Sequence, residues 1–138
     1  MDNSLFLSII ILLLIAVLFV MVSINTRKID QKKREKIIKE LYSLEKSINS
    51  EEVAVRRDAI IKLDNLLSKS LQLYFKNDSS CGENLKSAEK IFRKREYNRL
   101  WEAHKMRNKV VHDDYAVSKE EAREALQIYK ISINKILK

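Results

Sequence analysis

Three polar residues near the end of one predicted helix have the types and spacing for chemistry on a phosphodiester. Arg107 is followed directly by Asn108, and His112 comes five positions after the arginine. Arginine binds phosphate through parallel N–H donors and stabilises the charge that develops on it. Histidine titrates close to neutral pH, so it is suited to move a proton as a general base or acid. These residues therefore predict a site for a phosphate ester.

The helix that carries them, expected over about residues 94–111, places polar side chains on its apolar face. On a wheel of about 100° per residue, His104 lies about 60° and Asn108 about 100° from Arg107. The apolar residues interleaved with them are Tyr97, Leu100, Trp101 and Val111. An unpaired polar group on a buried face costs free energy, so these side chains need partners in the protein or in a ligand. A purely structural network, with Arg107 paired to a carboxylate of another helix, is the alternative.

Metal or thiol chemistry is not expected. His104, His112, Cys81 and the pair Asp113-Asp114 show none of the ligand spacings of known metal sites. Cys81 is the only cysteine, so no intrachain disulfide is possible, and we expect it to be an ordinary loop residue. The sequence predicts neither a metal nor another cofactor.

The elements that position these residues must be helices. The chain has 138 residues with one glycine and no proline, which argues against a turn-rich β-sandwich, a collagen-like chain and a glycine-rich phosphate loop. The composition is 46% hydrophobic and also 33% charged. These values separate when the chain is cut after Ile24, because all 27 basic residues follow that point. We expect an all-α protein with one segment in lipid and one in water.

Leu5 to Ile24 is long enough for one membrane crossing. Sixteen of these 20 residues are Leu, Ile, Val or Phe, and none is charged. At about 1.5 Å per residue, a helix of this length spans the roughly 30 Å hydrocarbon core. A buried core helix would need more polar positions, and a cleavable signal peptide would start with basic residues. We therefore expect residues 1–26 to be a permanent anchor and the lipid bilayer to be a partner.

The residues that flank this segment predict its orientation. No basic residue precedes it, and six follow it closely: Arg27, Lys28, Lys32, Lys33, Arg34 and Lys36. By the positive-inside rule the N-terminus lies outside the cell membrane and residues 27–138 form a cytoplasmic domain. The same charges are able to hold anionic lipid headgroups, although topology alone explains them.

The domain after the anchor reads as a small up-and-down bundle of four to five helices. Its first helix, with Ile37 and Leu41 on one face, is expected to continue from the membrane helix. A second helix is expected to be capped by Asn49 and Ser50 and to end near Asn77. The later segments are a loop over residues 77–82, a short helix over 85–92, the helix over 94–111, and a last helix that starts with a capping box at Ser118 and Glu121.

The pattern Arg107-Asn108-x3-His112, at the end of the penultimate helix of a small all-α domain, resembles the HEPN superfamily. The stretch Trp101 to Glu121 carries most of this resemblance. It implies a helical bundle that forms a homodimer with the two motifs facing one cleft. Active members are metal-independent ribonucleases of toxin–antitoxin, CRISPR and antiviral systems, whereas other members bind nucleotide or RNA without cleavage.

The resemblance also implies a role for each motif residue. Arg107 would hold the scissile phosphate, His112 would act as general base or acid for attack of the ribose 2′-hydroxyl, and Asn108 would orient the pair. Further RNA contacts are expected from His104, Lys109 and Tyr115. Some toxin members have a tyrosine two residues after the histidine, whereas Tyr115 is three after it.

Three functions are compatible with the sequence. The first is a membrane-tethered ribonuclease that acts as a toxin or defence effector, and the second is a module that binds nucleotide or RNA without cleaving it. The third is a membrane-tethered helical adaptor in which the polar network is structural. The 27 basic residues against 18 acidic ones after Ile24 favour RNA, although six of the basic residues lie beside the membrane segment.

Overall fold

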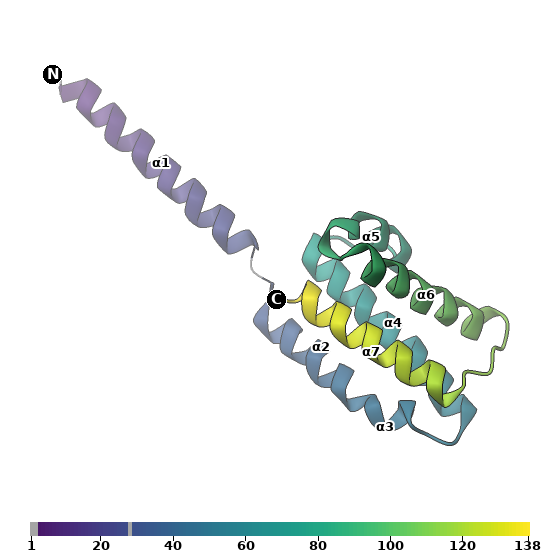
Figure 1. Cartoon of the computed structure of the whole chain (residues 1–138). Coiled ribbons are helices and arrows are strands. Elements are labelled where there is room, and N and C mark those ends of the chain that lie inside the picture. Colours follow the sequence, from purple (N-terminus) through teal and green to yellow (C-terminus); the bar gives the residue numbers. More distant parts are fainter. Residues whose placement is uncertain (1–2, 28) are drawn as a thin grey trace.

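The structure, a computed structural model, describes residues 3–27 and 29–138 and contains only helices and their connections within these ranges (Figure 1). The prediction of an all-α chain is confirmed. The α-helices are α1 (Asn3–Arg27), α2 (Gln31–Ser43), α3 (Glu45–Ile48), α4 (Val53–Phe75), α5 (Cys81–Ser87), α6 (Lys94–His112) and α7 (Lys119–Ile136), and a short 3-10 turn, η1 (Glu89–Ile91), follows α5.

Helix α1 stands apart from the other helices in Figure 1. Its large apolar side chains are exposed along its whole length, from Leu5 to Ile24. Asn3–Ile24 is long and apolar enough to cross a membrane, as a signal sequence of this length also would be. The finding agrees with the predicted apolar helix, and the topology stays a prediction. Met1, Asp2 and Lys28 lie outside the described residues.

The expectation that the first bundle helix continues from α1 is wrong. Ile29 and Asp30 are not helical, and α2 begins anew at Gln31. The Asp30 carboxylate accepts hydrogen bonds from the backbone N–H groups of Lys32 and Lys33, at 3.0 and 3.3 Å. An aspartate in this role satisfies the free donors of a new helix, and it therefore separates α2 from α1.

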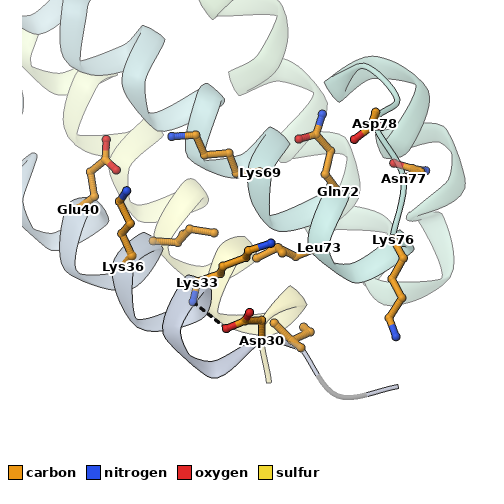
Figure 2. A pocket seen from close by; sticks show the side chains of 12 residues that line it. Asp30, Lys33, Lys36, Glu40, Lys69, Gln72, Leu73, Lys76, Asn77 and Asp78 are labelled. Atoms are coloured by element: carbon orange, nitrogen blue, oxygen red, sulfur yellow. Dashed lines mark hydrogen bonds between the residues drawn. The ribbon is translucent and has the colours of Figure 1, made fainter. Parts of the chain in front are cut away.

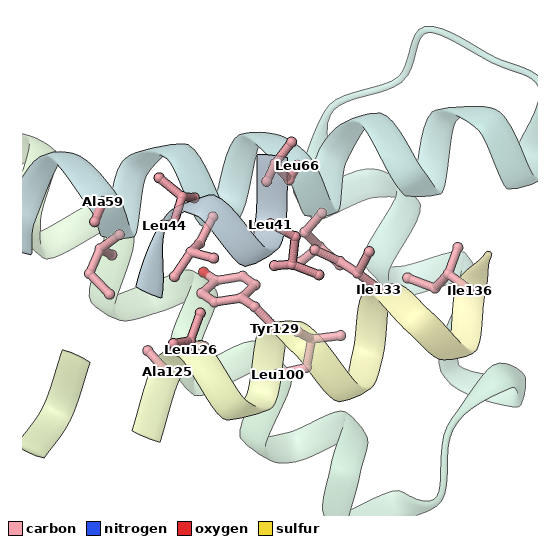
Figure 3. Close-up of a cluster of buried hydrophobic side chains, with 14 of the residues drawn as sticks. Leu41, Leu44, Ala59, Leu66, Leu100, Ala125, Leu126, Tyr129, Ile133 and Ile136 are labelled. Carbon is pink, nitrogen blue, oxygen red and sulfur yellow. The ribbon is translucent and has the colours of Figure 1, made fainter. Parts of the chain in front are cut away.

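Helix α4 is the centre of the bundle, and α2, α3, α5, α6 and α7 all pack against it. The core between α4 and α7 is filled by fully buried side chains around Tyr129 (Figure 3). Its members come from every long helix of the bundle and include Leu41, Leu63, Leu67, Leu100, Ile133 and Ile136. The apolar stripes predicted from the sequence are thus the surfaces that meet in the core.

Two predicted boundaries around α4 need correction. Helix α4 starts at Val53, and its N-cap is Glu52 rather than Asn49 or Ser50. The Ser50 hydroxyl accepts from the backbone N–H of Glu52 at 3.1 Å, so it stabilises the turn before the helix. At the other end α4 stops at Phe75, close to the predicted end.

Cys81 and Gly82 are not loop residues, because they begin α5. Ser80 caps this helix through a capping box, in which its hydroxyl accepts from the Glu83 N–H and the Glu83 carboxylate accepts from the Ser80 N–H. This is the same Ser-x-x-Glu pattern that correctly predicts the start of α7 at Ser118. Helix α6 also has the predicted limits, extended by one residue to His112.

Candidate functional site

A buried carboxylate from α4, Asp64, joins the polar side chains of α6 and α7. Asp64 is 2% exposed. Its Oδ1 lies 2.9 Å from Nδ1 of His104 and accepts a hydrogen bond of 3.0 Å from the hydroxyl of Tyr129. Its Oδ2 faces Nε of Arg107 at 3.6 Å. The polar residues on the apolar face of α6 therefore have their partner inside the protein.

The burial of Asp64 could have been predicted from its place in the sequence, although a search for apolar residues alone does not select it. Asp64 lies four residues after Ile60 and three before Leu67, so it occupies a position of the apolar stripe itself. An acidic residue at such a position is buried by the fold and needs a cationic or hydrogen-bonding partner. Since α6 also has an arginine and a histidine on its apolar face, the pairing of α4 with α6 satisfies both helices.

Arg107 is held on one edge and open on the other. Besides the ion pair with Asp64, its Nη1 donates to Oδ1 of Asn108 at 3.0 Å. Its Nε is buried and makes no hydrogen bond to any described residue. The side chain is 27% exposed, whereas that of Asp64 is 3% exposed. The guanidinium is thus fixed in direction, and it keeps donors for a further anion.

His104 is buried beside Asp64. It is 8% exposed, and its ring packs edge-on against Trp101 with centroids 5.8 Å apart. Its Nε2 faces the start of α5, where a Cβ on Gly82 would come within 3.7 Å. In this position His104 holds the Asp64 carboxylate. Its side chain is buried, so it is not exposed for the predicted contact with RNA.

His112 is the last residue of α6 and is exposed. In a regular helix it stands about 140° around and about 7.5 Å along the axis from Arg107. Among the described residues no hydrogen bond or ion pair connects the two side chains. The structure therefore joins Arg107 to Asn108 and Asp64, and it leaves His112 at the surface of the same helix end.

The two remaining predicted RNA contacts also lie near this helix end. Lys109 is exposed. Tyr115 donates from its hydroxyl to Oε1 of Glu121 at 2.6 Å, and this bond lowers the pKa of the Glu121 carboxyl. Whether Lys109 and Tyr115 contact RNA stays a prediction.

Arg57 is a residue of this region that sequence analysis missed. From α4 it reaches the end of α6, where its Nη2 donates to the carbonyl of Val110 at 2.9 Å and its Nη1 pairs with Asp114 at 2.5 Å. The side chain is 28% exposed, and its buried Nε has no hydrogen-bond partner among the described residues. Two half-open arginines thus flank the segment that carries His112. Arg57 directly follows Arg56 and lies outside the apolar stripe. Nothing in the local sequence therefore indicates that its side chain contacts the end of α6.

Three possible metal ligands meet beside the network, although their surroundings do not suit a cation. One ligand atom each of Asp64, Cys81 and His104 lie within 4.8 Å of one another. A bound metal needs the thiolate, yet burial and the charge of Asp64 raise the pKa of Cys81. The Asp64 oxygens are already engaged by His104, Tyr129 and Arg107. The donor set therefore fits a hydrogen-bonded network better than it fits a metal.

The phenol of Tyr129 belongs to the same network. Burial and the negative charge of Asp64 raise the pKa of Tyr129 well above its usual value. Both Cys81 and Tyr129 consequently remain protonated beside the carboxylate, and Arg107 forms an ion pair with Asp64. The chain matches no family model, no curated protein and no solved structure.

Proposed function

We propose that the chain is a membrane-anchored, HEPN-like ribonuclease that cleaves RNA without a metal ion. The observation that carries this proposal is the state of Arg107, which is oriented by a buried carboxylate and yet partly open to solvent. A guanidinium has five N–H donors, and Asp64 and Asn108 engage only part of them. The remaining donors suit a phosphate oxygen.

The orientation of Arg107 matters for catalysis as well as for binding. Because Asp64 and Asn108 already hold the guanidinium, little reorganisation is needed when negative charge develops on the phosphate. Arginine also stays charged at every physiological pH, so the buried Asp64 carboxylate always has its counter-ion. Asp64 and Asn108 are in this mechanism positioning residues for Arg107.

The proton transfer is assigned to His112. Its ring takes the proton of the ribose 2′-hydroxyl, the 2′-oxygen bonds to phosphorus, and the bond to the 5′-oxygen breaks. The leaving 5′-oxygen takes a proton from water or from a protonated histidine, and the product carries a 2′,3′-cyclic phosphate. Since His112 and Arg107 point in different directions from one helix, we propose that a homodimer brings the motifs of two chains to one RNA.

The anchor places this chemistry at a membrane. We propose that α1 crosses the cell membrane with its N-terminus outside, so that the basic flank after it and the helical bundle lie in the cytoplasm. A toxin or defence effector in this position would act on RNA close to the inner surface of the membrane.

A second candidate function follows from the same network. Arg107 already pairs with Asp64, and His104 is buried against that carboxylate, as a purely structural network requires. In this case the bundle is a non-catalytic module that binds nucleotide or RNA, or a membrane-tethered adaptor for another protein.

Cleavage by the full chain in neutral detergent separates these functions. Single-stranded RNA is incubated with the protein in EDTA, and the ends of the products are identified. We expect cyclic-phosphate ends from the wild type and a loss of at least about 100-fold in rate for Arg107→Gln and for His112→Ala. Arg95→Gln, an exposed residue of the same helix, is the matched control and should keep the wild-type rate.

The alternatives give different results in the same assay. RNA binding without cleavage, lost in Arg107→Gln and kept in His112→Ala, supports the non-catalytic binding module. A wild type that neither binds nor cleaves RNA contradicts both nucleic-acid functions and supports the adaptor. Cleavage that EDTA abolishes contradicts the metal-independent mechanism.

A further inference from the structure

An open pocket of about 600 Å³ lies between the start of α2 and the end of α4 (Figure 2). Four lysines line it: Lys33, Lys36, Lys69 and Lys76. All four are exposed, and within the described part of the chain none of their ammonium groups has an ion-pair or hydrogen-bond partner. Two segments that are separate in the sequence, the start of α2 and the end of α4, thus bring four positive charges to one place.

Three carboxylates also line this pocket, and they limit its charge. Asp30 already caps α2 through its Oδ1, whereas within the described residues Glu40 and Asp78 form no ion pair with the lysines of the pocket. Four lysines against three carboxylates leave one positive charge in excess. This balance suits a singly charged phosphodiester better than a phosphate that carries two or more charges.

The backbone at Lys76 has a conformation that a lysine rarely adopts. Lys76 has a φ of 53° and is the left-handed C-cap residue of α4. Glycine or asparagine is favoured there, because a side chain with a Cβ is strained in this conformation. In this chain the residue is a lysine, and it borders the pocket.

The pocket also lies at the end of the bundle that α1 joins. Ile29, which directly follows the break after α1, is part of its lining, together with Ile37 and Leu73. If α1 crosses the bilayer as proposed, the short connection to α2 keeps this end of the bundle close to the membrane surface, where basic residues attract anionic lipid. The apolar residues then face the glycerol and the first carbons of a lipid.

We infer that this pocket binds the phosphodiester of an anionic phospholipid headgroup. The inference rests on the proposed membrane placement of α1 and not on the ribonuclease activity. The lysines supply the charge, and the net charge of the pocket selects a diester. A bound headgroup would fix the orientation of the bundle relative to the membrane.

The test uses the full chain in neutral detergent and three soluble probes. These are dihexanoyl phosphatidylglycerol, dihexanoyl phosphatidylcholine and inorganic phosphate, each titrated while binding is measured by calorimetry. We expect the phosphatidylglycerol to bind at least about tenfold more tightly than the other two. Each lysine removed should weaken it about fivefold, so Lys33→Gln combined with Lys69→Gln should weaken it about 25-fold.

Two further variants keep this test independent of folding. Lys76→Gly removes a charge and relieves the left-handed backbone, so it should raise the melting temperature and still weaken phosphatidylglycerol binding about fivefold. Lys46→Gln combined with Lys105→Gln removes two exposed charges outside the pocket and should change the affinity less than twofold.

Each other outcome overturns the inference. If inorganic phosphate binds as tightly as phosphatidylglycerol, the ligand is a soluble phosphate and not a lipid. If phosphatidylcholine binds equally well, the contact is apolar. If the control pair weakens binding as much as the pocket pair, only the overall charge matters. Since the readout involves neither RNA cleavage nor membrane insertion, failure here leaves the proposed function standing, and failure of the ribonuclease assay leaves the lipid site standing.

Discussion

Arg56 and Arg107 show two different ways in which this bundle uses an arginine. Arg56 is 6% exposed, and it donates from Nε to the carbonyl of Val117 at 2.9 Å and from Nη1 to the carbonyls of Ser50 and Glu51 at 2.7 and 2.9 Å. Arg107 contacts one carboxylate at 3.6 Å and its own sequence neighbour. The Arg56 side chain links the segment before α4 to the segment before α7. The Arg107 side chain is partly exposed and has donors that form no hydrogen bond within the described residues.

This difference separates a structural arginine from a candidate ligand-binding one. A guanidinium that only stabilises the fold should be buried and have its donors satisfied, because unpaired buried donors cost free energy. Arg56 meets this description almost completely. Arg107 has a buried Nε without a hydrogen bond and a side chain that is 27% exposed. The buried Nε faces Asp64, and the exposed Nη groups are the donors that a phosphate could reach.

The largest expected effect tests this comparison directly. Arg56→Met leaves one buried and two part-buried carbonyls without their side-chain donor and should lower the free energy of unfolding by about 4 kcal/mol. In Arg107→Gln the glutamine amide keeps a donor near Asp64, and the position is partly exposed to solvent. This variant should therefore lower the free energy of unfolding by only about 1 kcal/mol. Urea unfolding of the full chain in neutral detergent measures both. Equal losses in the two variants would place Arg107 with Arg56 as a structural residue.

At alkaline pH the free energy of unfolding should depend on groups in the network around Arg107 and not on the contacts of Arg56. The folded-state pKa values of Cys81 and Tyr129 are raised, so both groups stay protonated in the folded protein after they ionise in the unfolded chain. Their contribution is fully present below the unfolded values of 9.0 and 10.0 and is lost as the pH rises above them. Each group then removes about 1.4 kcal/mol of stability per pH unit.

Unfolding curves between pH 8 and 11 measure this dependence. Cys81→Ala and Tyr129→Phe should each flatten it, whereas Arg56→Met should be less stable at every pH with the same slope. A wild-type slope that neither Cys81→Ala nor Tyr129→Phe changes would show that the two groups do not stay protonated when folded. The comparison among variants cancels the titration of the surface lysines, which they share.

The sequence predicted those parts of the fold that depend on local patterns. Periodicity gives α6 and the core face of each helix, and the capping box at Ser118 gives the start of α7. The same rules apply to Asp30 and Ser80, whose caps separate α2 from α1 and begin α5. The apolar segment before Asp30 led instead to the prediction of one continuous helix. The turn-forming residues around Ser80 led to the prediction of a loop.

Only about half of the candidate site could be predicted from the sequence. The wheel places Arg107, His104 and Asn108 on the buried face of α6 and thereby predicts that they need partners. It cannot name Asp64 or Arg57, because pairing between helices depends on how α4 and α6 are aligned in space. Periodicity along one helix carries no information on that alignment.

The smallest expected effect concerns Arg57, which combines features of the two arginines. It donates to one backbone carbonyl, as Arg56 does, and pairs with an exposed carboxylate at Asp114, whose side chain is 87% exposed. Asp114 has a φ of 51°, so glycine is favoured there. Asp114→Gly loses a surface ion pair and relieves the backbone, and the two effects should cancel to within about 0.5 kcal/mol.

Asp113→Gly is the matched control, because Asp113 has a φ of −112° and gains nothing from glycine. It should lower the free energy of unfolding by about 0.5–1 kcal/mol through backbone entropy alone. Urea unfolding of both variants decides the role of Arg57. A loss above about 2 kcal/mol in Asp114→Gly would mean that the ion pair holds the end of α6 as firmly as Arg56 holds its two connections. A loss near zero would mean that the ion pair contributes no more than the relief of the backbone, as expected for a surface pair.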